Sequence, residues 1–156
     1  MRTLVLGLGN ELAGDDAVGI VAARRLRERL DGDADVVESS ASGMALIEVL
    51  SGYDRAIIVD AIRSGRQPAG TIVRMDLSEV GDVVAPSLHQ AGLPELAAVA
   101  ERSSIAFPSE TTVLAVEVED PFTLGAPMTP AVEAAVGELV DRVVRWIDGP
   151  PDRSGA

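Results

Sequence analysis

The chain has 156 residues, of which 47% are hydrophobic and only 3% aromatic. This length predicts one domain, and this composition predicts a core of Val, Leu, Ile and Ala and excludes global disorder. A formal net charge of −12 repels nucleic acid and anionic lipid, so neither is an expected partner. The absence of Cys and Lys excludes disulfides, thiolate metal sites, a P-loop lysine and Schiff-base chemistry.

The first half of the chain alternates short apolar runs with longer amphipathic ones. Residues 4–6 form an apolar run that ends at Gly7-Leu8-Gly9-Asn10, which predicts a buried strand. Residues 17–30 gather apolar side chains on one face and arginines elsewhere, as an amphipathic helix does. Further along, we expect a strand at 36–37, a helix at 43–50 and a strand at 56–59 that ends in Asp60.

The second half continues the alternation. The β-prone run 71–75 is expected to be an edge strand or a hairpin arm, and 111–118 another strand. Ser87 starts a polar segment before a helix at 93–100, where Pro94 suits the first turn. The last helix is expected at 129–146, with Thr129 as N-cap, Pro130 at the first helical position and Glu133 in the first turn.

Strands that alternate with helices predict a mostly parallel sheet that is covered on both faces. We therefore expect an α/β fold, a three-layer α-β-α sandwich with a mostly parallel central sheet, phosphorylase/hydrolase-like in type. Residues 1–148 are expected to form a single domain, because no repeat or linker interrupts them. The tail 149–156, rich in Pro, Gly and Asp, is expected to be flexible.

The sequence gives no sign of a targeting or membrane segment. The apolar stretch 4–8 is too short for the apolar region of a signal peptide and runs directly into Gly9 and Asn10. No run of 18 or more apolar residues occurs anywhere, so no membrane contact is expected. We predict a cytoplasmic protein.

An acidic residue follows or ends each of the first three expected strands: Asp15 and Asp16, then Glu38, then Asp60. The carboxyl ends of parallel strands meet at one edge of a sheet, where sites in such folds form. Several carboxylates there repel one another unless a cation or protons intervene, which favours a cation site. The only imidazole, His89, would complete a set of two carboxylates and one nitrogen that suits zinc or nickel.

Each of these residues also has a simpler interpretation. One of the adjacent acids is expected to cap a helix, and Asp15 is the better candidate for that role. Asp60 could cap a turn, and a lone His89 is more often an ordinary surface or core residue. Only the combination of Asp16, Asp60 and His89 favours a metal site.

Two other kinds of site are alternatives to the cation site. A dinucleotide site would use Gly7 and Gly9, with Glu38 on the ribose, but it needs a third glycine where Leu12 stands. It would also place the acidic pair beside a pyrophosphate, so it is disfavoured. A serine hydrolase would use Ser40, His89 and Asp60, yet the Gly-x-Ser-x-Gly pattern of a nucleophile elbow is missing.

Four segments of the sequence together resemble the NiFe-hydrogenase maturation proteases. The first is an apolar strand followed by Gly-Leu-Gly-Asn and an acidic pair. The second is Ile-Ile-Val-Asp-Ala-Ile, in which the Asp is Asp60. The third is Ser-Leu-His-Gln-Ala-Gly-Leu-Pro around His89, and the fourth is Met-Thr-Pro-Ala-Val before the last helix. The four segments, at 4–19, 57–62, 87–96 and 128–132, occur in the order found in the family.

The resemblance implies an endopeptidase that removes a C-terminal extension from the precursor of a hydrogenase large subunit, after nickel insertion. It implies that Asp16, Asp60 and His89 are the catalytic and nickel-recognising residues, with no general base assigned among them. The nickel is expected to come with the precursor, and no organic cofactor is implied. The alternatives from other classes are a non-catalytic nickel-dependent module that checks the precursor and the serine-type hydrolase.

The loop after the second strand departs from the family. The family usually has Asp-Gly-Gly-Thr-x-Gly there, whereas this chain has Glu-Ser-Ser-Ala-Ser-Gly at 38–43. We expect this loop to shape the fit of the substrate. The predicted substrate-binding residues are Glu38, Ser40 and Gly43 from this loop, together with Asn10 after the first strand.

Overall fold

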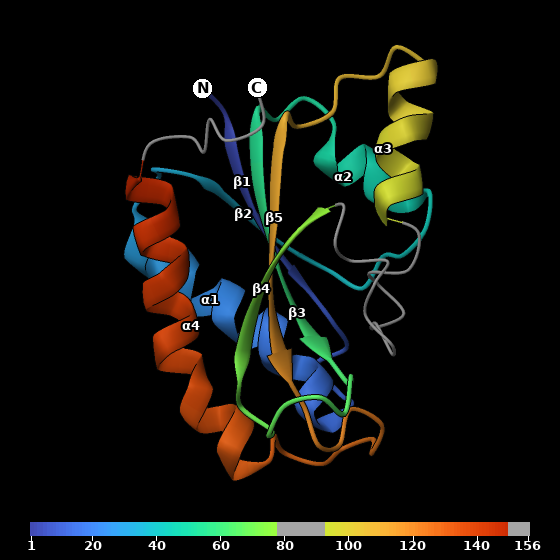
Figure 1. Ribbon diagram of the computed structural model, residues 1–156. Helices are drawn as coiled ribbons and strands as arrows, with labels where there is room; N and C mark the ends of the chain where they lie inside the picture. The colour runs from blue at the N-terminus through green and yellow to red at the C-terminus, as the bar shows by residue number, and fades with distance from the viewer. Residues whose placement is uncertain (78–92, 150–156) are drawn as a thin grey trace.

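A five-stranded sheet of order β2-β1-β3-β5-β4 forms the centre of the computed structural model, which describes residues 1–77 and 93–149 (Figure 1). Strands β1, β2, β3 and β5 run parallel, whereas β4 is antiparallel to β5 at the edge. The mostly parallel sheet and the edge strand are therefore confirmed. The strands are β1 (Thr3–Leu8), β2 (Asp35–Ser39), β3 (Arg55–Ile62), β4 (Ile72–Asp76) and β5 (Glu110–Glu117).

The helices cover both faces of this sheet. Figure 1 shows α1 and α4 side by side on one face and α2 with α3 on the other, and both pairs are in contact. The predicted three-layer α/β sandwich is thus confirmed. The helices are the short 3₁₀ helix η1 (Gly14–Ala17), α1 (Val18–Leu30), α2 (Ala45–Leu50), α3 (Leu93–Arg102) and α4 (Pro130–Asp148).

The strands divide their side chains between two apolar layers. Along β1, Leu4 and Leu6 belong to the layer beneath α2 and α3, and Val5 to the layer beneath α1 and α4. This alternation follows from the two-residue period of a strand. Within the described residues, the fully buried apolar side chains are aliphatic, as the low aromatic content predicts.

Helix α1 packs unusually close to the sheet because two glycines face each other. A Cβ on Gly19 would overlap the carbonyl oxygens of Leu8 and Val59, and a Cβ on Gly7 would overlap the carbonyl oxygen of Gly19. Only glycine permits this approach of helix backbone to strand backbone. The contact fixes the start of α1, and with it η1, against the carboxyl ends of β1 and β3.

Several boundaries differ from the sequence expectation by a few residues. Strand β2 spans Asp35–Ser39 instead of 36–37, so Glu38 and Ser39 belong to the strand and not to the loop after it. Strand β3 does not end at Asp60 but continues to Ile62, because β5 continues beside it and pairs Ala61 with Val116 and Ile62 with Glu117. Within residues 1–77 and 93–149, none of the helices combines the length and apolarity needed to cross a membrane.

Candidate active site at the carboxyl ends of the strands

The parallel strands β1, β3 and β5 all end at the lower edge of the sheet in Figure 1. The β1–η1 loop and the β5–α4 loop leave the sheet at this edge, and β2 ends beside β1. Sites in open α/β sheets form outside these ends. We refer to this edge as the carboxyl rim.

Asp16 is held at the carboxyl rim by the loop that precedes it. Its Oδ2 accepts a hydrogen bond of 2.9 Å from the backbone N–H of Asn10. A Cβ on Gly9, which has φ +154°, would overlap the backbone carbonyl oxygen of Asp16. The Asn10 side chain in turn accepts a bond of 3.0 Å from the N–H of Leu12. The loop therefore folds back on itself and fixes a partly buried carboxylate next to the end of β1.

Asp60 is fully buried inside β3 rather than at the strand end. It follows Val59, which pairs with Gly7, so it lies level with Leu8, the last residue of β1. Its Oδ1 accepts a bond of 2.8 Å from the N–H of Ala61. Asp16 and Asp60 therefore both border the end of β1, from the loop that follows it and from the neighbouring strand.

The third predicted ligand, His89, lies outside the described residues. Within 1–77 and 93–149, no group of three or more His, Asp or Glu side chains is arranged to hold a metal ion. The convergence of Asp16, Asp60 and His89 stays a prediction.

Asp15 has a structural role that the sequence did not reveal. The prediction that it caps the first helix is wrong, since neither η1 nor α1 has a side-chain cap. Its fully buried carboxylate instead accepts bonds from the backbone N–H groups of Glu119 (3.0 Å), Asp120 (2.9 Å) and Thr129 (2.6 Å). Thr129 is the N-cap residue of α4 as predicted, but its hydroxyl also bonds Asp15 instead of capping its own helix. Asp15 thus ties the start of α4 and the β5–α4 loop to η1.

Three of the four predicted substrate-binding residues line one pocket. This pocket of about 270 Å³ lies at the ends of β1 and β2 and includes Asn10, Glu38 and Ser40 in its wall. The turn beside it is stabilised by the Ser39 hydroxyl, which accepts a bond of 3.0 Å from the N–H of Ala41. Gly43 is not part of the wall. We refer to this cavity as the β2 pocket.

Glu38 is not available as a metal ligand. Its two carboxylate oxygens accept bonds of 2.8 Å from the guanidinium groups of Arg24 and Arg27. The Arg27 bond, together with that of Arg24, lowers the pKa of Glu38 against the opposing effect of partial burial. The two arginines are one turn apart on α1, and that spacing was the available signal for a pair aimed at a common acid.

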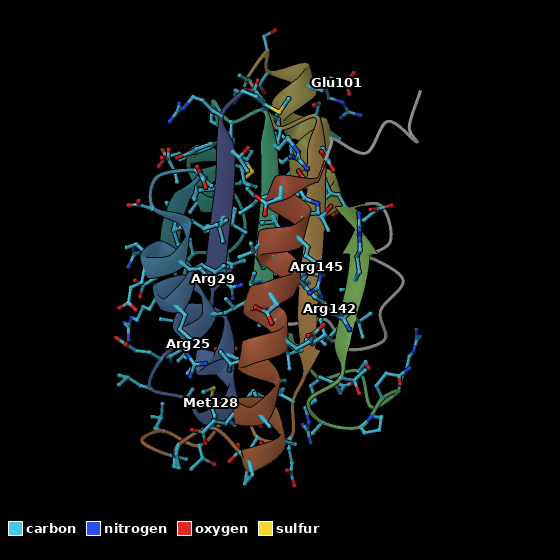
Figure 2. The ribbon with its side chains drawn as sticks, turned by 90° about the vertical axis from the view of Figure 1, so that its left-hand side faces the viewer. Arg25, Arg29, Glu101, Met128, Arg142 and Arg145 are labelled. Carbon is cyan, nitrogen blue, oxygen red and sulfur yellow. The ribbon has the colours of Figure 1, made fainter. Side chains whose placement is uncertain are left out.

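A second pocket lies between α4 and the sheet. It has a volume of about 420 Å³ and includes Arg74, Arg142, Arg145 and Trp146 in its wall. Figure 2 shows Arg142 and Arg145 partway along α4, well away from Met128 near the carboxyl rim. Glu138 accepts bonds of 3.0 Å from both α4 arginines, so its carboxylate offsets part of the positive charge in the wall of this pocket. None of the predicted site residues in the described chain lines it.

The comparisons with known proteins all find proteins of hydrogenase maturation. The family model for hydrogenase maturation protease matches residues 20–146. The hydrogenase 2 maturation protease of Escherichia coli K12 is 30% identical over 148 residues, which cover 92% of this chain and 89% of that protein. The hydrogenase expression/formation protein HupD of Rhodobacter capsulatus is 31% identical over 157 residues, covering 93% of this chain and 72% of that protein.

Solved structures show the same similarity. The hydrogenase maturating endopeptidase HybD from Escherichia coli superposes with a TM-score of 0.81 at 28% identity, covering 99% of this chain and 94% of that one. The NiFe-hydrogenase maturation protease HybD from Thermococcus kodakarensis gives a TM-score of 0.75 at 25% identity, covering 94% and 99%. The similarity in sequence and in fold thus extends over nearly the whole chain.

Proposed function

The chain belongs to the hydrogenase maturation protease family and is an endopeptidase of hydrogenase maturation, and from this premise we propose that it removes the C-terminal extension of a NiFe-hydrogenase large-subunit precursor after nickel insertion. We further propose that Asp16, Asp60 and His89 recognise the nickel that the precursor carries. In this proposal the protein acts in the cytoplasm, as one domain over residues 1–148.

The observation that carries the site assignment is the placement of Asp16 and Asp60 around the end of β1. Asp16 is fixed by the Asn10 N–H and by the close contact of Gly9. Asp60 is fixed by its position within a strand that is paired on both sides. An Asp side chain is short, so fixing the backbone also fixes the carboxylate, and the two carboxylates are preorganised around the end of β1.

The donor set fits nickel as cargo of the substrate. Two carboxylates and one imidazole are suitable ligands for a borderline divalent ion, whereas carboxylates alone favour harder ions such as magnesium. Bound nickel would polarise the scissile carbonyl or a water molecule. Glu38 adds nothing to this set, because Arg24 and Arg27 neutralise it.

The β2 pocket is the proposed place for the residues that flank the scissile bond. It lies directly beside the loop that holds Asp16, and its wall offers the Asn10 amide and the Ser40 hydroxyl as hydrogen-bonding groups. The segment 38–43, which consists of the end of β2 and the loop after it, forms part of the wall through Glu38, Ser39 and Ser40. We propose that this loop determines which precursor sequence fits.

The decisive experiment follows the mass of a nickel-loaded large-subunit precursor during incubation with the protein. Loss of the C-terminal peptide with nickel, and no loss from nickel-free precursor, is the expected result. The parallel reaction with Ser40→Ala is expected to keep its dependence on nickel and to show at most a higher KM, because Ser40 is proposed as a hydrogen-bonding group of the β2 pocket and not as a nucleophile.

Two other outcomes would contradict the proposal. Nickel-dependent association that leaves the extension intact after long incubation would identify a binding module that checks the precursor. Cleavage that ignores nickel and is abolished by Ser40→Ala would identify a serine-type hydrolase.

A further inference from the structure

Three large apolar side chains are exposed at the carboxyl rim. The exposed fractions are 64% for Leu12, 68% for Phe122 and 74% for Leu124. Leu12 belongs to the β1–η1 loop, and the other two to the β5–α4 loop. Single exposed apolar residues are ordinary on protein surfaces, but several on adjoining loops indicate an interaction site. We refer to Leu12, Phe122 and Leu124 as the rim patch.

The two loops that carry the rim patch are joined by backbone hydrogen bonds. Ala13 and Leu124 form an antiparallel bridge, and the N–H of Gly125 donates to the carbonyl of Leu12 at 2.7 Å. The N–H of Asp15 donates to the carbonyl of Asp120 at 2.8 Å. The two loops therefore present their apolar side chains from one connected unit.

The Phe122 segment is also fixed internally. The Asp120 carboxylate accepts bonds from the N–H groups of Phe122 (3.0 Å) and Thr123 (3.1 Å). The Arg63 guanidinium lies over the Phe122 ring, 5.2 Å from its centre. Exposed apolar side chains that are held in place in this way lose little conformational freedom when a partner binds.

The rim patch is continuous with the proposed substrate site. Leu12 also lines the β2 pocket beside Asn10 and Glu38. The loop that carries Leu12 is the one whose fold fixes Asp16. A protein docked on the rim patch would therefore bring its adjoining chain to the pocket and to the predicted nickel-recognising residues.

We infer that the rim patch docks the folded body of the large-subunit precursor, through an apolar surface next to its C-terminal extension. This inference rests on the proposed function, since it takes the precursor as the substrate. A protein partner is favoured because aromatic and arginine side chains, here Phe122 and Arg63, are enriched in protein interfaces.

A second copy of this chain is a poorer occupant. A stable dimer buries about 800 Å² on each partner, which three side chains do not approach. Each copy also has a formal net charge of −12, so two copies repel one another. A small rigid patch fits a transient contact with a substrate that must leave after cleavage.

The test replaces Leu12, Phe122 and Leu124 together with Ser, and a second variant replaces only Phe122 and Leu124, which unlike Leu12 do not line the β2 pocket. Nickel-loaded precursor is the probe for both variants. Both its association with the protein and its cleavage are measured. We expect at least about a 10-fold weaker association and a matching rise in KM, with kcat within about 2-fold of the wild type. The side chains are exposed, so the thermal midpoint should be unchanged. The matched control is Ile105→Ser, because Ile105 is also exposed but precedes β5 at the opposite end of the sheet.

The outcomes separate this inference from the proposed function. Unchanged association and KM in the triple variant, while the wild type cleaves, would overturn the docking inference alone. A wild type that binds but does not cleave would overturn the protease proposal, and loss of that binding in the triple variant would still support docking. No binding by the wild type overturns both. A wild-type dimer that the triple variant converts to a monomer would show that a second copy occupies the rim patch.

Discussion

The neighbours Asp15 and Asp16 occupy opposite environments in one turn of η1. Asp15 is fully buried, and its carboxylate accepts hydrogen bonds from three backbone N–H groups and the Thr129 hydroxyl. Asp16 is partly exposed and accepts a bond from the Asn10 N–H. Successive side chains of a 3₁₀ helix point about 120° apart, so one acid turns inward while its neighbour faces the carboxyl rim.

The surroundings of each carboxylate, and not its place in the sequence, determine its role. The buried charge of Asp15 is stabilised by two N–H groups shortly after β5 and by the N–H of Thr129 at the start of α4, where the helix dipole also favours an anion. Both oxygens of this carboxylate already accept hydrogen bonds within the protein, so the structure does not present Asp15 as a metal ligand. Asp16 combines a fixed position with partial exposure at the carboxyl rim, which suits its proposed part in recognising an ion that the precursor carries.

The largest expected effect is the loss of activity when the rim acids are neutralised. Asp16→Asn and Asp60→Asn keep the size of each side chain but remove its charge. We expect cleavage of nickel-loaded precursor to fall at least about 100-fold in each variant. His89→Ala should fall similarly, because no other imidazole can replace it. The measurement is the initial rate of peptide release, followed by mass.

A stability measurement on the same variants tests the contrast with Asp15. For Asp16→Asn we expect a free energy of unfolding within about 1 kcal/mol of the wild type, since partly exposed polar sites contribute little. A fully active Asp16→Asn protein that unfolds much more easily would reverse the roles assigned to the two neighbours.

The next largest effect is the loss of stability in Asp15→Ala. The substitution leaves the N–H groups of Glu119, Asp120 and Thr129 without their acceptor, and each partly buried donor that loses its bond costs about 1–3 kcal/mol. We expect the free energy of unfolding, measured with urea, to fall by about 3 kcal/mol or more.

Thr129 provides the matched control for Asp15. Thr129→Val keeps the shape but loses the hydroxyl bond to Asp15, so it should cost about 1 kcal/mol, while Thr129→Ser should retain the bond. Equal stability of Asp15→Ala and the wild type would show that the buried carboxylate is not an anchor.

The fold could be predicted from the sequence because its signals are local. Apolar runs such as those of β1 and β3 are short and continuous, as strands covered on both faces require. The Pro at the start of α4 and the amphipathic pattern of α1 mark helices just as directly. The extent of β3 escaped prediction, since Ala61 and Ile62 owe their pairing to β5, more than 50 residues away along the chain.

The site could be predicted only in part. Asp16 and Asp60 were proposed from their places after strands and from the family resemblance, and the structure places both beside the end of β1. The role of Asp15 depends on partners 104 to 114 residues away, which no local pattern reveals. The rim patch could not be predicted either, because the sequence does not distinguish exposed Leu and Phe side chains in loops from those that belong to the core.

The smallest expected effect concerns Glu38, an acid at the same rim that is partly buried like Asp16 but is paired with two arginines. Hydrogen bonds from Arg27 and Arg24 lower its pKa in the folded protein. A lowered folded pKa stabilises the protein above the ordinary Glu range, and this stabilisation disappears as the pH falls through the lowered pKa.

We therefore expect Glu38→Gln to reduce the free energy of unfolding near pH 7 by about 1 kcal/mol or less, since both arginine side chains are about half exposed, at 51% and 50%. The difference from the wild type should vanish in acid, and it should shrink with added salt, which screens the pair. Urea unfolding at a series of pH values measures it. A difference that persists below the lowered pKa would mean that Glu38 stabilises the end of β2 by packing rather than by charge. In that case the ion pairs with Arg24 and Arg27 would not account for the contribution of Glu38 to stability.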